Sequence, residues 1–180
     1  MRQLGLEFRL IRPDAGIEEH LMGRATRSTP RGFALACARA KALSASLFVR
    51  SGIVVGVDTV VAVNGRILGK PRNRADARRM LRLLSGRTHT VTSGVAVVRM
   101  PDRLVLTGTE TTRVAFRQLS DREIERYIAT PEPYDKAGAY GIQELAGIFV
   151  RSVSGCYLNV VGLPVELLLS LLKQVGYRPA

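Results

Sequence analysis

Runs of β-branched residues alternate along this chain with segments in which apolar residues recur every three or four positions. The run Ile53–Val63 and the two long runs Thr88–Val98 and Leu104–Phe116 have the composition of β-strands. Asn64-Gly65 directly follows the first run, and this dipeptide is typical of a two-residue hairpin turn. The pattern therefore predicts long antiparallel strand pairs.

Four other segments have the apolar spacing of helices, and several of them carry signals that fix where they begin. Asn73 can cap a helix, Ser120 and Glu123 have the spacing of a capping box, and Pro164 suits a first helical position. The predicted helices cover 33–47, 73–84, 120–129 and a C-terminal segment that ends at Gly176.

Three shorter apolar runs predict further strands, at Phe8–Ile11, Ile148–Val153 and Tyr157–Val161. Met1–Leu4, followed by Gly5, has the pattern of the last turn of a helix, so the chain is expected to begin inside an element. Together these elements predict an α/β fold with a mixed, partly antiparallel sheet and flanking helices.

Length and composition exclude several classes of protein. The chain has 180 residues, of which 46% are hydrophobic and 23% are charged, so we expect one globular domain over residues 1–180. No apolar run is long enough for a membrane span, and the first twenty residues lack the apolar segment that a secretory signal requires. Two cysteines make no disulfide framework and favour a reduced, cytoplasmic protein. With two histidines, any metal would be a hard cation held by oxygen.

The net charge of +12 is compatible with a polyanionic partner such as nucleic acid or a phosphate-bearing ligand. The 27 cationic residues are spread along the chain without a long run, which favours a habit of residue usage over a nucleic-acid-binding stripe. Only four of them are lysines, and this scarcity makes each one informative: Lys41, Lys70, Lys136 and Lys173.

Asp58 interrupts a β-branched run that is otherwise suited to burial. A buried carboxylate is costly unless it is paired, hydrogen-bonded or bound to a metal, which makes Asp58 a candidate catalytic or metal-binding residue. Strand alternation equally allows a carboxylate on a solvent face, with Val57 and Thr59 on the opposite one. The pattern alone leaves both interpretations open.

Lys70 lies between a glycine and a proline, just beyond the predicted hairpin. Pro71 holds it out of helical geometry, and an ammonium presented in this way can bind a phosphate, although a solvent-facing turn lysine has the same pattern. The glycine-rich segment 133–143 adds Lys136 and the amide of Gln143, which can donate to and accept from a base edge. A structural turn would have similar residues.

Six short sequences, in order along the chain, resemble those of the Maf (septum-formation) family of nucleoside triphosphate pyrophosphatases. They are ARAKA at 38–42, GVDTVV at 56–61, GKP at 69–71, ML-LSGR-H-V at 80–91, DKAGAYGIQ at 135–143 and NVVGLP at 159–164. The resemblance implies two lobes around a cleft, in a fold related to inosine-triphosphate pyrophosphatases. Within the family, DKAGAYGIQ is similar to the branch that hydrolyses dTTP and UTP.

The resemblance also implies roles for individual residues. The family's proton acceptor corresponds to Asp58, which would hold a divalent cation, Mg or Mn, together with Glu19, or with Glu18 in its place. The family's basic phosphate-contacting positions correspond to Lys41, Lys70 and Lys136. Its specificity positions correspond to Thr59 and Gln143. A pyrimidine nucleoside triphosphate is the implied substrate, and a homodimer is the implied assembly.

One departure from the family leaves alternatives open. Family members begin with a strand and a Ser-x-Ser-Pro-Arg-Arg loop, and this sequence begins at a point that follows them. The chain could therefore be a catalytically impaired, truncated nucleotide-binding protein, or its start could be misplaced. A sister branch that prefers 7-methyl-GTP is a further alternative.

Overall fold

Five strands form one antiparallel sheet in this computed structural model, which describes residues 6–12, 16, 21 and 28–177. The strands are β1 (Gly52–Val63), β2 (Arg66–Leu68), β3 (Thr88–Met100), β4 (Leu104–Phe116) and β5 (Val150–Ser154). They lie in the order β2-β1-β3-β4-β5. The predicted α/β class with flanking helices is confirmed, but all the pairings described are antiparallel rather than mixed.

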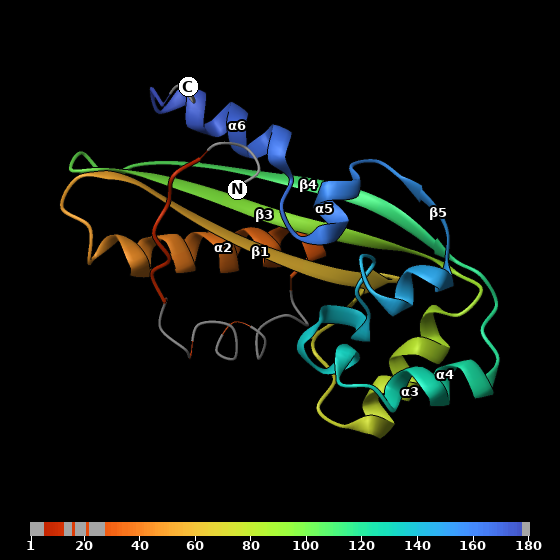
Figure 1. Cartoon of the computed structure of the whole chain (residues 1–180). Helices are drawn as coiled ribbons and strands as arrows, with labels where there is room; N and C mark the ends of the chain where they lie inside the picture. Colours follow the sequence, from red (N-terminus) through yellow and green to blue (C-terminus); the bar gives the residue numbers. More distant parts are fainter. Residues whose placement is uncertain (1–5, 13–15, 17–20, 22–27, 178–180) are drawn as a thin grey trace.

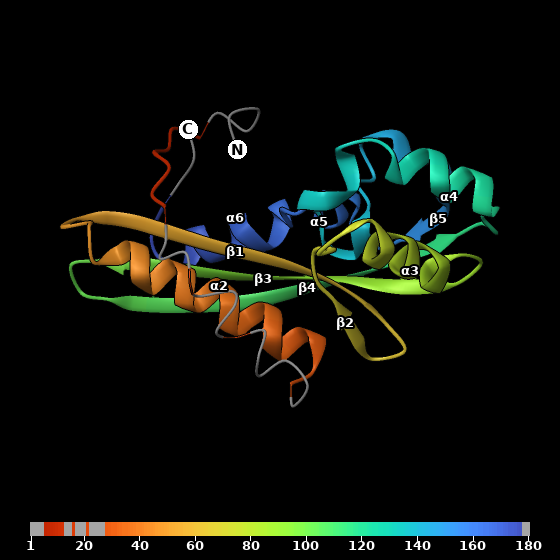
Figure 2. The same cartoon turned by 90° about the horizontal axis from the view of Figure 1, so that it is seen from below.

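The β1–β2 hairpin leaves much of β1 at the edge of the sheet. Asn64 and Gly65 have φ angles of 51° and 75°, as the predicted two-residue turn requires. β2 pairs with β1 only from Val61 to Val63. Within the described part of the chain, the residues of β1 before Val61 therefore have a strand partner, β3, on one side only, and Figure 2 shows the hairpin projecting from the long strands.

Helix α2 (Pro30–Ser46) covers one face of the sheet (Figure 1). It begins at Pro30, ahead of the predicted start at residue 33, because the Thr29 side chain caps the helix by accepting a hydrogen bond from the Gly32 backbone N–H at 3.1 Å. Ala96 and Val98 of β3 pack against the buried alanines of the helix. The many small residues along this contact allow the helix to lie close to the sheet.

The opposite face of the sheet is covered by α5 (Tyr157–Val161) and α6 (Val165–Gln174). Leu168, Leu171 and Leu172 of α6 are buried and pack with Val95 and Val97 of β3. Val165 and Leu169 of the same helix are only half-buried.

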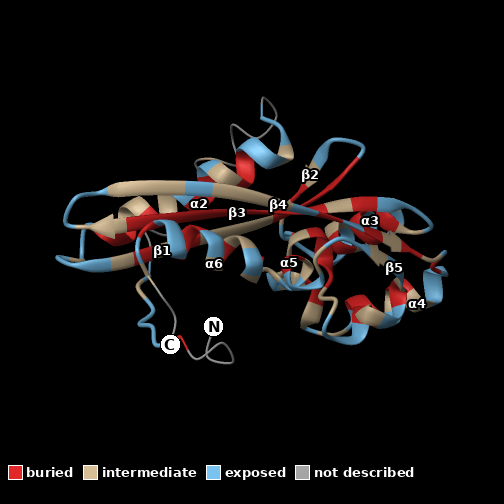
Figure 3. Ribbon diagram, turned by 90° about the horizontal axis from the view of Figure 1, so that it is seen from above, coloured by how far each residue is buried: buried red, intermediate tan, exposed pale blue. Residues whose placement is uncertain are grey.

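Two helices and three short 3-10 segments form a second packed region at one end of the sheet. They are α3 (Arg74–Leu84), α4 (Asp121–Ile128), η3 (Glu132–Asp135), η4 (Ala137–Ala139) and η5 (Leu145–Phe149). Asn73 caps α3, and Ser120 with Glu123 forms the predicted capping box of α4. Figure 3 shows buried residues both along β3 and inside this region.

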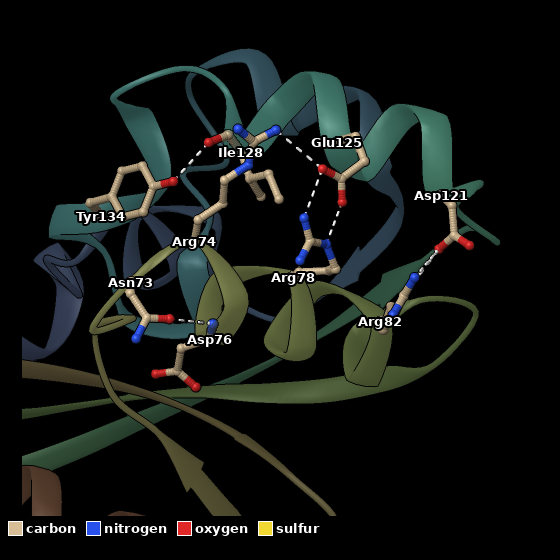
Figure 4. A network of polar contacts seen from close by, with 9 residues as sticks. All are labelled: Asn73, Arg74, Asp76, Arg78, Arg82, Asp121, Glu125, Ile128 and Tyr134. Carbon is tan, nitrogen blue, oxygen red and sulfur yellow. Dashed lines mark hydrogen bonds and ion pairs between the residues drawn. The ribbon is translucent and has the colours of Figure 1, made fainter.

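Surface ion pairs join α3 to α4 (Figure 4). The Glu125 carboxylate accepts hydrogen bonds from Arg74 and Arg78, and Arg82 donates to Asp121 at 3.0 Å. The hydrogen bond from Arg78 lowers the pKa of Glu125 to about 2. Because these groups are solvent-exposed, each pair adds little stability, and the apolar core beneath them holds the two helices together.

Two predicted strands are not strands in the structure. Tyr157–Val161 is the helix α5, because Asn159 is buried and Gly162, with a φ of 115°, ends a helical turn there. The described residues around Phe8–Ile11 pair with no strand. Of the predicted strand Ile148–Val153, Ile148 belongs to η5 and β5 begins at Val150. The helix end predicted at Met1–Leu4 lies outside the described residues.

None of the helices that the structure describes has the length and apolar character needed to cross a membrane.

Candidate active site

Asp58 and Thr59 are neighbours on the edge strand β1, and their side chains point to opposite faces of the sheet. Asp58 faces α2, where Lys41 reaches it. Thr59 faces α5, where its hydroxyl contacts the backbone carbonyl of Gly162. The site is therefore built around a strand edge, with groups from both faces converging on two adjacent residues.

Two glycines allow α2 to approach β1 closely enough for this contact. A Cβ at Gly56 would lie 2.3 Å from the Ala38 carbonyl oxygen, and one at Gly94 would lie 2.4 Å from that of Ala34. Neither position has room for a side chain, because the atoms that it would meet belong to the helix backbone. Gly94 pairs directly with Asp58 in the β1–β3 ladder, so the close contact occurs beside the carboxylate.

Lys41 Nζ donates a hydrogen bond to Asp58 Oδ1 at 2.7 Å. Both side chains are largely buried, with exposed fractions of 19% and 11% respectively. A partly buried ion pair with this geometry is screened less than a surface pair. The ammonium compensates the charge of the Asp58 carboxylate and fixes its orientation at the strand edge.

Two adjoining pockets lie beside this edge. The smaller, of about 60 Å³, is lined by Asp58, Thr59 and Lys70 among others, and the larger, of about 270 Å³, is lined by Thr59, Lys136 and Gln143 among others. Thr59 and Ala137 line both pockets. Five of the sequence-predicted residues thus line these two pockets, and Lys41 is bonded to Asp58.

A backbone hydrogen bond connects the two loops that carry Lys70 and Lys136. The Gly138 N–H donates to the Gly69 carbonyl at 3.0 Å. Gly138 has a φ of 72°, and a Cβ there would lie 2.9 Å from Val61 Cγ1. Only glycine suits both the backbone conformation and the close packing, which explains the glycine in this loop.

Lys136 has acidic partners that sequence reasoning missed. Its Nζ lies 2.8 Å from Asp135 Oδ1 and 3.1 Å from Glu144 Oε2, and it donates to the Glu132 carbonyl at 3.2 Å. Burial lowers the pKa of Lys136, but its hydrogen bonds to Asp135 and Glu144 outweigh this and raise the pKa above its ordinary value. Asp135 has a lowered pKa, chiefly through the Lys136 hydrogen bond and to a lesser degree through the charge of Lys70.

A buried histidine supports one wall of the larger pocket. Tyr140 lines that pocket, and its hydroxyl lies 2.8 Å from Nε2 of His89 on β3. Burial lowers the pKa of His89 to about 4, so the imidazole is neutral near pH 7. The sequence indicated only that two histidines are too few for a metal site. Strand alternation, which places His89 and Val91 on one face, was the available signal.

Glu132 is a further residue that sequence reasoning missed. Its carboxylate accepts hydrogen bonds from the Tyr127 hydroxyl at 2.9 Å and from the backbone N–H groups of Leu145 and Ala146 at 3.1 and 3.3 Å. It thereby connects η3 to the first residues of η5. The intervening loop carries Lys136 and Gln143, so Glu132 fixes both ends of the segment that lines the larger pocket.

The expected metal ligand Glu19 lies outside the described residues. Among residues 6–12, 16, 21 and 28–177, no three His, Cys, Asp or Glu side chains come close enough together to hold a metal ion. Asp58 is the carboxylate that lines the smaller pocket. One carboxylate is compatible with a divalent cation of the kind that takes one or two carboxylates and completes its shell with substrate phosphates and water.

The sequence is similar to a known protein family and to individual bacterial proteins. The sequence matches the family described as "Maf-like protein" over residues 1–175. It is 44% identical to a dTTP/UTP pyrophosphatase of Pelotomaculum thermopropionicum, over 99% of this chain and 91% of that protein. It is also 44% identical to a dTTP/UTP pyrophosphatase of Dictyoglomus thermophilum, over 98% of this chain and 90% of that protein. It is 41% identical to a dTTP/UTP pyrophosphatase of Carboxydothermus hydrogenoformans, over 98% of this chain and 92% of that protein. This chain therefore belongs to the Maf family.

Proposed function

We propose that this chain hydrolyses dTTP and UTP to the nucleoside monophosphate and pyrophosphate. The observation that carries the proposal is the convergence of Asp58, Thr59, Lys70, Lys136 and Gln143 on two adjoining pockets. The names of the similar proteins support the same substrates. The smaller pocket would take the reacting phosphates, and the larger one would take the base and sugar.

Asp58 is the proposed general base. Its carboxylate orients a water molecule and takes its proton while the water oxygen forms a bond to the α-phosphorus. The bond between the α-phosphorus and the bridging oxygen breaks, and that oxygen leaves with pyrophosphate. Lys41 holds the carboxylate in place at 2.7 Å.

The lysines offset the negative charge that develops on the leaving pyrophosphate. Lys70 is exposed on the turn that borders the smaller pocket, so its ammonium can approach a phosphate without first breaking a buried contact. Lys136 already shares its charge with Asp135 and Glu144. A triphosphate would therefore compete with these carboxylates for Lys136.

Gln143 and Thr59 are the proposed base-selecting residues. The Gln143 amide can accept from an imide N–H and donate to a ring carbonyl at the same time. Uracil and thymine present these two groups side by side, whereas cytosine presents the reverse arrangement. This pairing favours dTTP and UTP over CTP.

A divalent cation, Mg or Mn, would be held by Asp58 together with substrate phosphates, with Glu19 as the further ligand that the family resemblance implies. When bound, it would supply positive charge to the phosphate oxygens.

The test is an assay of pyrophosphate release with Mg or Mn, comparing the parent with Asp58→Asn on dTTP, UTP and 7-methyl-GTP. Loss of the base should lower turnover of dTTP and UTP by about 10²- to 10⁴-fold. Asp102→Asn is the matched control, because Asp102 is bonded to Arg99 near the β3–β4 turn and lines neither pocket. Parental turnover in Asp58→Asn would show that another group is the base, and preference for 7-methyl-GTP would place the chain in the sister branch.

We propose a cytoplasmic setting, where nucleoside triphosphates are abundant. Neither Cys37 nor Cys156 is in a disulfide, as expected of a reducing compartment. The homodimer that the resemblance implies is a separate prediction. Light scattering in solution would give about twice the 19.7 kDa mass of one chain.

A further inference from the structure

Ser93 is a fully buried hydroxyl that directly faces the site without lining it. It is paired with Thr59 across the β1–β3 ladder, and the two side-chain oxygens lie 2.7 Å apart. Ser93 has no exposed surface, whereas Thr59 lines both pockets. Any influence of Ser93 on a bound nucleotide must therefore act through Thr59.

The direction of these hydrogen bonds follows from the number of protons available. The Gly162 carbonyl can only accept, so the Thr59 hydroxyl, 3.3 Å away, donates its single proton there. Thr59 must then accept from Ser93. The reverse direction would leave the Ser93 proton buried without an acceptor, because Thr59 is its only hydrogen-bond partner within the described residues.

The direction of these hydrogen bonds determines whether the Thr59 hydroxyl acts as a donor or as an acceptor toward the larger pocket. With its proton committed to Gly162, the Thr59 oxygen has a lone pair available and acts as an acceptor, beside its own methyl group. An acceptor is complementary to the imide N–H of uracil or thymine, whose one proton can be shared between the Thr59 oxygen and the Gln143 amide oxygen. It is repelled by the unprotonated ring nitrogen of cytosine, which presents a lone pair at the same place.

We propose that Ser93 is a positioning residue for base selection, because it fixes the Thr59 hydroxyl as an acceptor and thereby favours uracil and thymine over cytosine. The proposal rests on the proposed function, in which Thr59 contacts the base. Without Ser93, the long 3.3 Å contact to Gly162 alone would hold the Thr59 proton, and the hydroxyl could rotate to donate into the pocket.

The experiment measures kcat/KM for UTP and CTP in the parent, Ser93→Ala and Thr92→Val. Ser93→Ala should lower the UTP-to-CTP ratio by about three- to tenfold, the range expected for one hydrogen bond. Thr92→Val is the matched control, because it removes a buried hydroxyl one position away on the opposite face, bonded at 3.0 Å to Thr111 Oγ1. It should leave the ratio unchanged. Ser93→Cys, which keeps the volume but donates weakly, should follow Ser93→Ala and guards against a packing defect.

A double-mutant cycle separates positioning from general damage. In a Thr59→Val background, which lacks the hydroxyl, Ser93→Ala should change the ratio no further. An unchanged ratio in Ser93→Ala, an equal shift in the Thr59→Val background, or a parent that hydrolyses CTP as well as UTP would each overturn the proposal. A parent that hydrolyses neither nucleotide would refute the proposed function instead. Calorimetric binding of UMP and CMP to the same variants would still test the Ser93 proposal, with the same ratios expected.

Discussion

The lysine side chains at this site differ in how far neighbouring carboxylates already compensate their positive charge. Lys41 is bonded to Asp58, and Lys136 is bonded to Asp135 and Glu144. Lys70 is exposed on its turn beside the smaller pocket. A phosphate that enters therefore meets Lys70 without the cost of breaking a buried ion pair, which makes this residue the most direct test of phosphate binding.

Lys70→Gln should lower kcat/KM for UTP by about 10²-fold, the lower end of what removing one preorganised donor costs, because the ammonium is exposed and partly screened. Lys173→Gln removes the same charge from the last turn of α6, which lines neither pocket, and should have no effect. Steady-state kinetics of both variants at one ionic strength make the comparison. Equal losses in the two variants would indicate a general charge effect rather than a contact.

At the scale of elements, the spacing between α2 and the sheet decides whether Lys41 can reach Asp58. Gly56 and Gly94 place the helix backbone against the strands, with no room for a Cβ at either position. The ion pair is a consequence of this packing. A helix that is displaced outward would carry Lys41 away from the carboxylate even though both residues were unchanged.

Gly94→Ala should therefore reduce activity more than its effect on stability explains. The added methyl group would meet the Ala34 carbonyl and force α2 outward, at a cost of about 1–3 kcal/mol in the free energy of unfolding. Val97→Ala lies on the same strand but faces α6, so it destabilises the fold without moving Lys41. Urea unfolding and turnover would be measured for both variants. If turnover in the two variants falls equally for equal stability loss, the spacing argument is wrong.

At the scale of the whole molecule, one buried titratable group joins the stability of the fold to the pocket. His89 is 2% exposed and packs edge-on against Phe116 and Tyr140 in the core of the end region. Burial lowers its pKa from 6.5 to about 4. Because the imidazole is neutral when folded, acid should loosen the same core that supports the Tyr140 wall of the larger pocket.

The free energy of unfolding should fall as the pH drops from about 6.5 to about 4. The unfolded chain binds a proton near pH 6.5, and the folded protein binds it only near pH 4, so protonation favours unfolding between these values and not above them. The full loss is of the order of 3 kcal/mol. His89→Gln should lack this component, as urea unfolding at several pH values would show. The same pH dependence in parent and variant would contradict the assignment to His89. Glu123 and Glu125, whose pKa values are lowered to about 2, contribute at lower pH.

Elements with strong local signals were predicted correctly, and those that depend on tertiary contacts were not. The hairpin at Asn64-Gly65 and the capping box of α4 are confirmed, because their residues satisfy backbone groups within a few positions. The helix Tyr157–Val161 was predicted as a strand because its valines favour one. Buried Asn159 decides the matter by donating to the Val91 carbonyl and Thr112 Oγ1. No local pattern contains those partners.

The sequence by itself determined the fold class and the elements with strong local signals, because periodicity, capping and composition are local properties of the chain. Its resemblance to a known family selected the set of candidate residues. Only the tertiary structure decided that Lys41 is bonded to Asp58, that Lys136 shares its charge with Asp135 and Glu144, and that the side-chain oxygens of Ser93 and Thr59 lie within hydrogen-bond distance. The physical reason is that such contacts depend on strand register and on how closely α2 packs, and both are set by residues far apart along the chain.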